Sequence, residues 1–131
     1  MKRIIIGLAA VLMATAAWAM EPAMYSDSSL GKVLTDAKGM TLYTFDKDAK
    51  GATDSACKDK CIVAWPPFLA AEGAMAEGDW TIVNVVDKDG KPAKMWAYDG
   101  WPLYYYVKDT KAGDVLGEDI GKVWHVVKQG M

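Results

Sequence analysis

The sequence predicts a mainly β domain, that is, a β-rich α+β fold in which two pseudo-symmetric repeats of antiparallel hairpins carry one or two short helices. Three observations favour this fold class. Short segments rich in β-forming residues alternate with turns that contain Gly and Asp. The phrase LYTFDKD at 42–48 returns as LYYYVKD at 103–109. Segments that suit a helix are few and short, so strands dominate the expected architecture.

The first nineteen residues have the pattern of a cleaved signal peptide. Lys2 and Arg3 form a positive start, residues 4–17 are uncharged, and residues 17–19 (Ala-Trp-Ala) match a cleavage site. The apolar run is shorter than the stretch of about 20 residues that a membrane-spanning helix needs. We therefore expect cleavage after about Ala19, export to the bacterial periplasm or the medium, and no stable membrane insertion of the mature chain.

The mature chain has the size of one domain. Removal of residues 1–19 leaves 112 of the 131 residues, of which 20–29 predict a flexible arm and 30–131 a single two-repeat β domain. Loss of the two basic signal residues leaves thirteen Lys and Arg against seventeen Asp and Glu, a net charge of −4. Dispersed acidity disfavours nucleic acid and anionic membranes as partners, because both require clustered basic residues.

The first half of the mature chain predicts a hairpin followed by a short helix. The segments 31–36 and 40–45 suit strands and flank a Gly-containing turn. A polar loop follows over 46–55. Residues 56–63 suit a short helix, which must end before Pro66 because the residue before a proline disfavours helical geometry.

The second half predicts four strands joined by turns and a polar loop. An Asp-Gly pair follows the first of these strands and is among the strongest hairpin signals. Gly and Pro between the second and third strands predict another turn. The four strands cover 80–86, 93–98, 103–107 and 122–127.

An offset of 61 residues superimposes the two halves. We assign repeat one to about 31–67 and repeat two to about 93–127, and expect an approximate twofold relation in which each copy buries the face that the other presents. Trp65 and Trp124 also match once the alignment is shifted by two residues from this offset. The pairs matched by the offset of 61 are Gly39 and Gly100, Leu42 and Leu103, Tyr43 and Tyr104, Phe45 and Tyr106, and Asp48 and Asp109.

The repeated phrase has two interpretations, one architectural and one functional. Side chains alternate along a strand, so Tyr43 and Phe45 share one face, as do Tyr104 and Tyr106. Aromatic residues at this spacing favour a buried core, with an Asp after each strand fixing a loop. Alternatively, the Tyr hydroxyls and the Asp carboxylates of both copies converge on a ligand. Further candidates for contacts with such a ligand are Trp65, Trp124 and His125.

Both copies fit the pattern Y-x-[FWY]-x-x-D, at 43–48 and 104–109. In this the chain resembles a family of bacterial secreted repeat proteins, many of which are predicted lipoproteins. The string C-x-x-x-C-x-x-x-W-P-P at 57–67 is similar to the segment that follows the first repeat in that family. The resemblance implies export and a repeat architecture but no particular activity. The chain lacks the lipoprotein cysteine, so a lipid anchor is not expected.

Cys57 and Cys61 are the only cysteines of the chain. In an exported protein, two cysteines and no others predict one disulfide. The alternative is a redox-active pair, since Lys58 and Lys60 would lower a thiolate pKa, which Asp59 opposes. The spacing differs from the C-x-x-C of thioredoxin-like enzymes, which favours the structural disulfide.

The sequence offers few ligands for a metal or for haem. His125 is the only histidine and lies between apolar neighbours, a position more typical of a structural side chain. Met20 and Met24 are soft ligands of the kind that bind Cu(I). The C-x-x-C-H string for covalent haem does not occur, so we assign no cofactor and no metal ligand.

The sequence holds no catalytic constellation that we recognise, since one histidine leaves few acid–base options and no phosphate-binding loop occurs. We therefore predict an exported, non-enzymatic module that binds a ligand or a protein partner in the cell envelope through aromatic surface. The alternative prediction is a redox or metal-handling protein, with copper or haem, that uses Cys57, Cys61 and His125.

Overall fold

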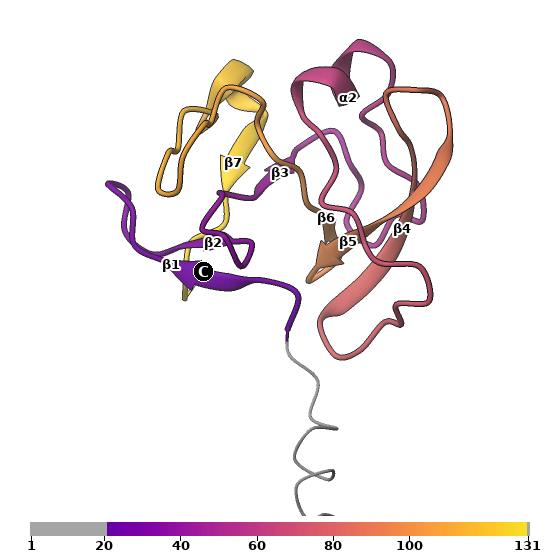
Figure 1. Ribbon diagram of the computed structural model, residues 1–131, viewed down its shortest axis with the longest axis horizontal. Helices are drawn as coiled ribbons and strands as arrows, with labels where there is room; N and C mark the ends of the chain where they lie inside the picture. Colours follow the sequence, from indigo (N-terminus) through magenta and orange to yellow (C-terminus); the bar gives the residue numbers. More distant parts are fainter. Residues whose placement is uncertain (1–20, 131) are drawn as a thin grey trace, which may run out of the picture.

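The computed structural model describes residues 21–130, so the predicted signal peptide lies outside the described residues. Within them, seven strands form three antiparallel sheets with one short α-helix, which confirms the mainly β fold class (Figure 1). No helix in this part of the chain has the length and apolar character that crossing a membrane requires. The elements are β1 Met24–Ser26, β2 Val33–Thr35, β3 Tyr43–Phe45, α2 Lys60–Ala64, β4 Trp80–Val86, β5 Pro92–Tyr98, β6 Trp101–Pro102, the 3-10 helix η1 Ile120–Lys122 and β7 Trp124–Val126.

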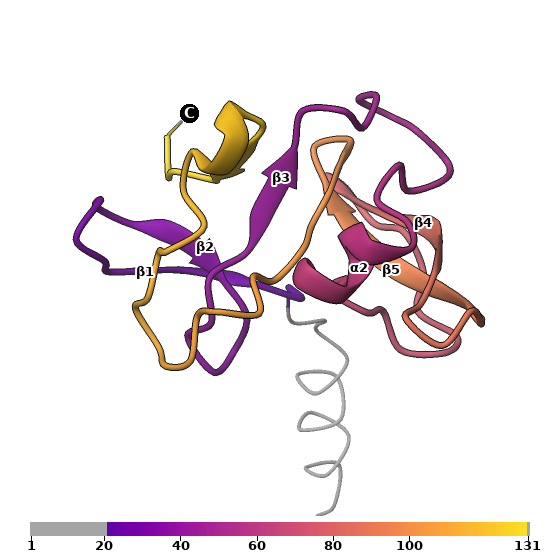
Figure 2. The same ribbon diagram turned by 90° about the horizontal axis from the view of Figure 1, so that it is seen from above.

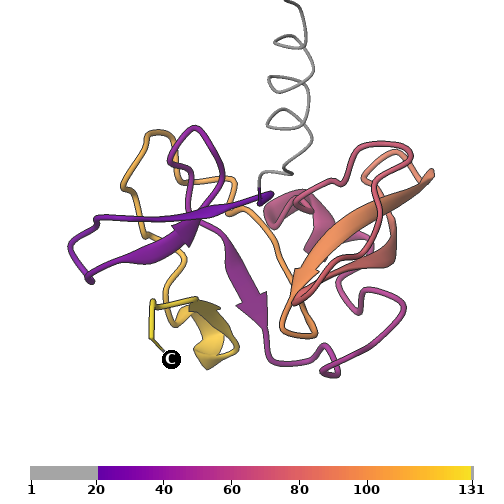
Figure 3. The same ribbon diagram turned by 90° about the horizontal axis from the view of Figure 1, so that it is seen from below.

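The elements group into two lobes. One lobe holds the β1–β2 sheet and the C-terminal segment, and the other holds the β4–β5–β6 sheet with α2 beside it (Figures 1 and 2). Strand β3 runs between the lobes, as the view from below also shows (Figure 3). It pairs antiparallel with β7, with Tyr43 opposite Val126 and Phe45 opposite Trp124.

Each repeat completes the hairpin of the other. The N–H of Leu34 in β2 donates to the carbonyl of Val127, which follows β7 (2.9 Å). The N–H of Trp96 in β5 donates to the carbonyl of Phe68, which follows α2 (2.9 Å). These two contacts occupy matching places in the two halves, so the last segment of each repeat extends the sheet of the other.

Tyr43 and Tyr104 meet where the two repeats cross. The N–H of each donates to the carbonyl of the other, over 2.8 and 2.9 Å. The two residues stand at equivalent places of the repeated phrase, so this exchange joins a position to its own counterpart, as expected at an approximate twofold axis.

The glycine three residues before each repeated phrase lies where the two repeats approach each other closely. Gly39 and Gly100 have positive φ angles of 87° and 86°. A Cβ on Gly39 would lie 2.9 Å from the Cβ of Ala112, and a Cβ on Gly100 would lie 3.0 Å from the backbone N of Gly51. Both the backbone conformation and the missing Cβ therefore require glycine here.

Strands β4 and β5 agree with the predicted strands 80–86 and 93–98 to within one residue. The helix prediction over 56–63 was wrong at its start, because α2 begins at Lys60. Asp59 has φ 57° and ψ −122°, a conformation that cannot belong to a right-handed helix.

The predicted pairing of 31–36 with 40–45 was confirmed in part. An antiparallel bridge joins Thr35 to Thr41, and the N–H of Asp36 donates to the carbonyl of Met40 (3.0 Å). The regular strand pairs are different, because β2 pairs with β1 and β3 with β7. The residues expected as an arm therefore contain a strand. Ala23 is buried beside it, and the hydroxyls of Ser26 and Thr35 are hydrogen-bonded across the pair (2.7 Å).

The strand predicted over 103–107 also differs from the structure. Regular pairing with β5 covers only Trp101–Pro102, after which Tyr104 bridges to Tyr43 and to Pro67. The segment changes partners at Tyr104 because it enters the crossing of the two repeats. The closing strand β7 lies inside the predicted 122–127, shortened where Lys122 takes a positive φ of 63°.

We expect neither half of the chain to fold alone. A fragment of residues 21–78 keeps β3 but lacks β7, and a fragment of 79–130 lacks the segment after α2 that extends β5. Circular dichroism should show no cooperative melt for either fragment, and mixing equal amounts should restore one. The control is the intact chain cut at an engineered site beside Met75, which is 80% exposed, so we expect a break there to be tolerated. A cooperative melt of one isolated half would contradict the exchange of strands.

Candidate functional site

The tyrosines of the repeated phrase bind the aspartates of the opposite copy. The hydroxyl of Tyr43 donates to Oδ2 of Asp109 over 2.6 Å, and that of Tyr104 donates to Oδ2 of Asp48 over 2.8 Å. All four side chains are buried, both tyrosines completely. Each repeat therefore supplies the partner that the other's buried polar group requires.

The second oxygen of each carboxylate fixes a loop of its own repeat. Oδ1 of Asp48 accepts the N–H of Ala56 (2.7 Å), and Oδ1 of Asp109 accepts the N–H of Leu116 (2.9 Å). Each aspartate thus joins the loop after its strand to the tyrosine of the other repeat. This supports the architectural interpretation of the phrase, because the polar atoms are already satisfied within the protein.

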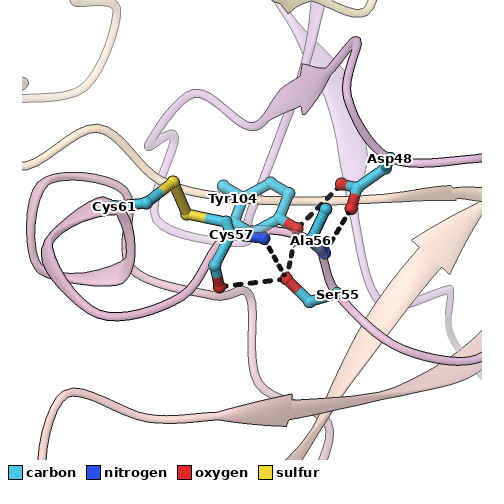
Figure 4. The surroundings of a disulfide bond; sticks show 6 residues. All are labelled: Asp48, Ser55, Ala56, Cys57, Cys61 and Tyr104. Atoms are coloured by element: carbon cyan, nitrogen blue, oxygen red, sulfur yellow. Dashed lines mark hydrogen bonds between the residues drawn. A yellow bond between two sulfur atoms is a disulfide. The ribbon is translucent and has the colours of Figure 1, made fainter.

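The two copies differ in one further contact. Tyr104 and Ser55 share a hydrogen bond between hydroxyls (2.6 Å), and Ser55 Oγ accepts the N–H of Cys57 (3.1 Å; Figure 4). In the other copy the hydroxyl of Tyr43 accepts the N–H of Gly117 directly (3.1 Å). A Cβ on Gly117 would lie 2.9 Å from the Tyr43 ring, so glycine permits the direct contact.

Burial controls the ionisation of these groups. It raises the pKa of Tyr43 far above the ordinary value of 10, and the hydrogen bond to Asp109 adds to this shift. Burial likewise raises the pKa of Tyr104, and the charge of Asp48 adds to it. The pKa of each aspartate is also raised by burial, and partly restored by the hydrogen bonds it accepts. At neutral pH both tyrosines therefore keep their protons and donate hydrogen bonds to the aspartates.

Four aromatic rings stack through the crossing of the repeats. Phe45 lies on Trp124 with ring centres 4.1 Å apart, Trp124 on Trp65 at 3.8 Å, and Trp65 on Tyr106 at 4.2 Å. The two tryptophans are nearly parallel, 3° apart, and each is only 5% exposed. The structure thus places Trp65 and Trp124, which the sequence suggested as ligand contacts, inside the core.

Cys57 and Cys61 form the disulfide that the sequence predicts, with Sγ atoms 2.05 Å apart. The bond closes the segment that leads into α2, next to the Ser55 contact of Tyr104 (Figure 4). Cys57 is fully buried. Because both sulfurs are bonded to each other, neither is a thiolate ligand unless the disulfide is first reduced.

His125 lies apart from that segment, on β7. Its Nε2 is 2.8 Å from Oδ2 of Asp46, which follows β3, so the contact joins the two strands of the central sheet. Within residues 21–130, no group of three or more His, Cys, Asp and Glu side chains is arranged to hold a metal ion.

A groove that extends from the second lobe to the C-terminal segment of the first was not predicted from the sequence. It consists of two adjoining hollows that share Tyr98 and Asp79. The first has a volume of about 620 Å³ and the second about 820 Å³. We call this surface the aromatic groove, and its aromatic side chains are Tyr25, Trp80, Trp96, Tyr98 and Trp101.

The repeat comparison contained the signal that would have found this groove. By its backbone contacts Trp96 takes the place of Leu34, the same register puts Tyr98 at the place of Asp36, and at the offset of 61 Trp101 matches Met40. These aromatic residues have no aromatic counterpart in repeat one, so the shared architecture does not require them. Aromatic residues confined to one copy of a repeat are candidates for function.

The rings of the groove meet at angles. The ring centres of Trp80 and Trp96 are 6.0 Å apart with an 80° angle, and those of Trp80 and Tyr98 are 4.8 Å apart with a 43° angle. Tyr25 lines the second hollow, where burial and then the neighbouring Tyr98 hydroxyl raise its pKa to about 12. Except for Trp80, these side chains are partly exposed, so their rings are accessible from solvent.

Alkaline titration tests the buried tyrosines. Their pKa is raised in the folded state, so the stability that they contribute is complete below pH 10 and is lost as the pH rises above it. We expect Tyr43 and Tyr104 to ionise only when the protein unfolds. Ultraviolet absorbance of tyrosinate, recorded beside circular dichroism, measures both events. Reversible ionisation of all six tyrosines in the folded protein would contradict this.

Removal of one hydroxyl tests the exchanged hydrogen bonds. Tyr43→Phe leaves a carboxylate oxygen of Asp109 and the N–H of Gly117 without a partner, and should cost about 1.5–3 kcal/mol. The matched control is Tyr106→Phe, whose hydroxyl makes no hydrogen bond within residues 21–130 and whose ring stays in the stack. Its free energy of unfolding should change by less than about 0.5 kcal/mol. Equal denaturant midpoints for the two variants would reject the role of the exchange.

Comparison with known proteins agrees with the resemblance seen in the sequence. A family model described as a secreted repeat of unknown function matches twice, over residues 25–68 and 84–128. No curated protein and no solved structure matches the chain. The two matches cover more than half of the chain and divide it at the boundary between the two interlocked repeats, and the chain therefore belongs to this family of secreted repeats.

Proposed function

We propose that the chain is an exported, non-enzymatic module that binds a ligand in the cell envelope through the aromatic groove. The observation that carries this proposal is the gathering of partly exposed aromatic side chains from strands β1, β5 and β6 around two hollows of about 620 and 820 Å³. Small-molecule sites are commonly concave, between about 300 and 1,000 Å³, and lined by apolar and aromatic groups with a few polar ones.

The repeated phrase is a weaker candidate for the same role. Its hydroxyls and carboxylates are hydrogen-bonded to one another, and both tyrosines are completely buried. A ligand that reached them would have to replace bonds on which the crossing of the repeats depends. The groove needs no such opening, because its rings are already accessible.

A binding role is favoured over a catalytic one by the chemistry of the groove. The first hollow presents rings, carboxylates and the indole N–H of Trp80, which donates to Oε1 of Glu21 (3.4 Å). Aromatic rings recognise a ligand by stacking and by shape. We infer that the groove holds and orients a ligand without changing its bonds.

The location of the site is tested by nuclear magnetic resonance of the exported protein with a mixture of small neutral, anionic and cationic fragments. We expect fragments to shift the indole signals of Trp80, Trp96 and Trp101 more than those of the buried Trp65 and Trp124. The substitution Tyr98→Ala should abolish these shifts, since Tyr98 lines both hollows.

The matched control is Leu116→Ala, which truncates a side chain that is 59% exposed and lines neither hollow. It should leave the shifts unchanged, and both variants should melt cooperatively. Fragment shifts that gather elsewhere on the protein, or none at all, would refute the groove as the binding site.

A further inference from the structure

The charge of the groove indicates which ligands it can take. The first hollow is lined by three acidic residues, Glu21, Glu77 and Asp79, and by no Lys, Arg or His. None of the three forms an ion pair with a basic side chain of residues 21–130. The hollow is therefore negative, and an anion would be repelled from it.

The second hollow is also lined by more acidic than basic residues. It shares Asp79 and adds Asp99 and Glu118, against Lys128 and His125. Asp99 is 3.8 Å from Lys50, but both side chains are more than half exposed and solvent screens the pair. Along the whole groove, carboxylates outnumber the cations that could balance them.

The aromatic rings restrict the ligand further. Trp80 lies at 80° to Trp96 and at 43° to Tyr98, so these three rings border the first hollow from different directions. Trp96 and Tyr98 are partly exposed in this hollow, whereas Trp80, which contacts both, is 6% exposed. A cation can therefore reach the rings of Trp96 and Tyr98, and the negative face of an aromatic ring attracts it.

From these observations we infer that the aromatic groove binds a small organic cation of the quaternary ammonium class. This inference rests on the function proposed above. The methyl groups of such a cation are apolar and pack on rings, while its charge faces the carboxylates of Glu77 and Asp79. A primary ammonium keeps its water more strongly. The volume of about 620 Å³ suits a small molecule.

The experiment compares two probes of nearly the same shape. Choline carries the quaternary charge, and 3,3-dimethylbutan-1-ol replaces its nitrogen by carbon and is neutral. Each is titrated into the exported protein while the indole signals of Trp80 and Trp96 are followed. We expect choline to bind at least about fivefold more tightly than the alcohol, and this preference to diminish at high salt.

Charge variants give the second measurement. Glu77→Gln removes one carboxylate from an exposed position and should weaken choline binding severalfold while leaving the alcohol unaffected. Asp27→Asn is the matched control, because it removes an exposed carboxylate that pairs with Lys32 and lines neither hollow. Melting temperatures of both variants check that the fold persists.

The outcomes separate this inference from the proposed function. Equal affinity for choline and the alcohol at the groove would overturn the inference and leave the groove as a ligand site. No shift with either probe, while other fragments do shift the groove, would overturn the inference alone. Shifts caused by an oligolysine peptide but not by choline would overturn it in favour of a basic protein partner. Failure of all fragments at the groove would reject both.

Discussion

The exchange of tyrosine and aspartate between the two repeats is the constraint on which the rest of the structure depends. A hydroxyl or a carboxylate without a partner is costly in a protein interior. Tyr43 finds its acceptor only in Asp109, and Tyr104 finds its acceptor in Asp48, so each repeat is satisfied by the other. Short hydrogen bonds to a charged acceptor are also among the stronger ones in proteins. The crossing of the repeats is thereby fixed in one arrangement.

This exchange explains the spacing of the Y-x-[FWY]-x-x-D pattern. The first position supplies the hydroxyl that crosses to the other repeat, and the third position, on the same strand face, supplies Phe45 or Tyr106 to the ring stack. The aspartate follows where the strand has ended, since the N–H of Asp48 donates to the carbonyl of Phe45 (3.0 Å) and turns the chain back. One oxygen of the aspartate accepts a hydrogen bond from its own repeat, and the other accepts one from the tyrosine of the other repeat.

The sequence predicted the parts of this fold that depend on local signals. The hairpin of β4 and β5 has an Asp-Gly turn and long runs of β-forming residues, and the disulfide follows from two cysteines in an exported chain. The partner of β3 could not be predicted in the same way. The glycine turn before it favours pairing with the preceding strand, whereas the partner chosen, β7, lies some eighty residues along the chain. Long-range exchange of strands leaves no trace in a local pattern.

The same limit applied to the candidate site. Trp65 and Trp124 were among the candidate ligand contacts. Their match across the repeats indicates shared architecture, and the structure places them in the central stack. A comparison of repeats brings out the residues that agree. Trp96, Tyr98 and Trp101 differ from their counterparts in repeat one, so the comparison did not select them as site residues.

The agreement and disagreement of the two copies divide the molecule by role. Residues that match at the offset form the crossing of the repeats. Both copies must make the same contacts there, so few substitutions are compatible with it. At Leu34, whose backbone contacts match those of Trp96, repeat one carries a buried aliphatic side chain that is 2% exposed. The same place in the fold thus accepts a buried leucine or a partly exposed ring. The shared scaffold therefore does not require Trp96, Tyr98 and Trp101. Because the crossing of the repeats holds the scaffold, β5 and β6 can carry these rings without a counterpart in repeat one.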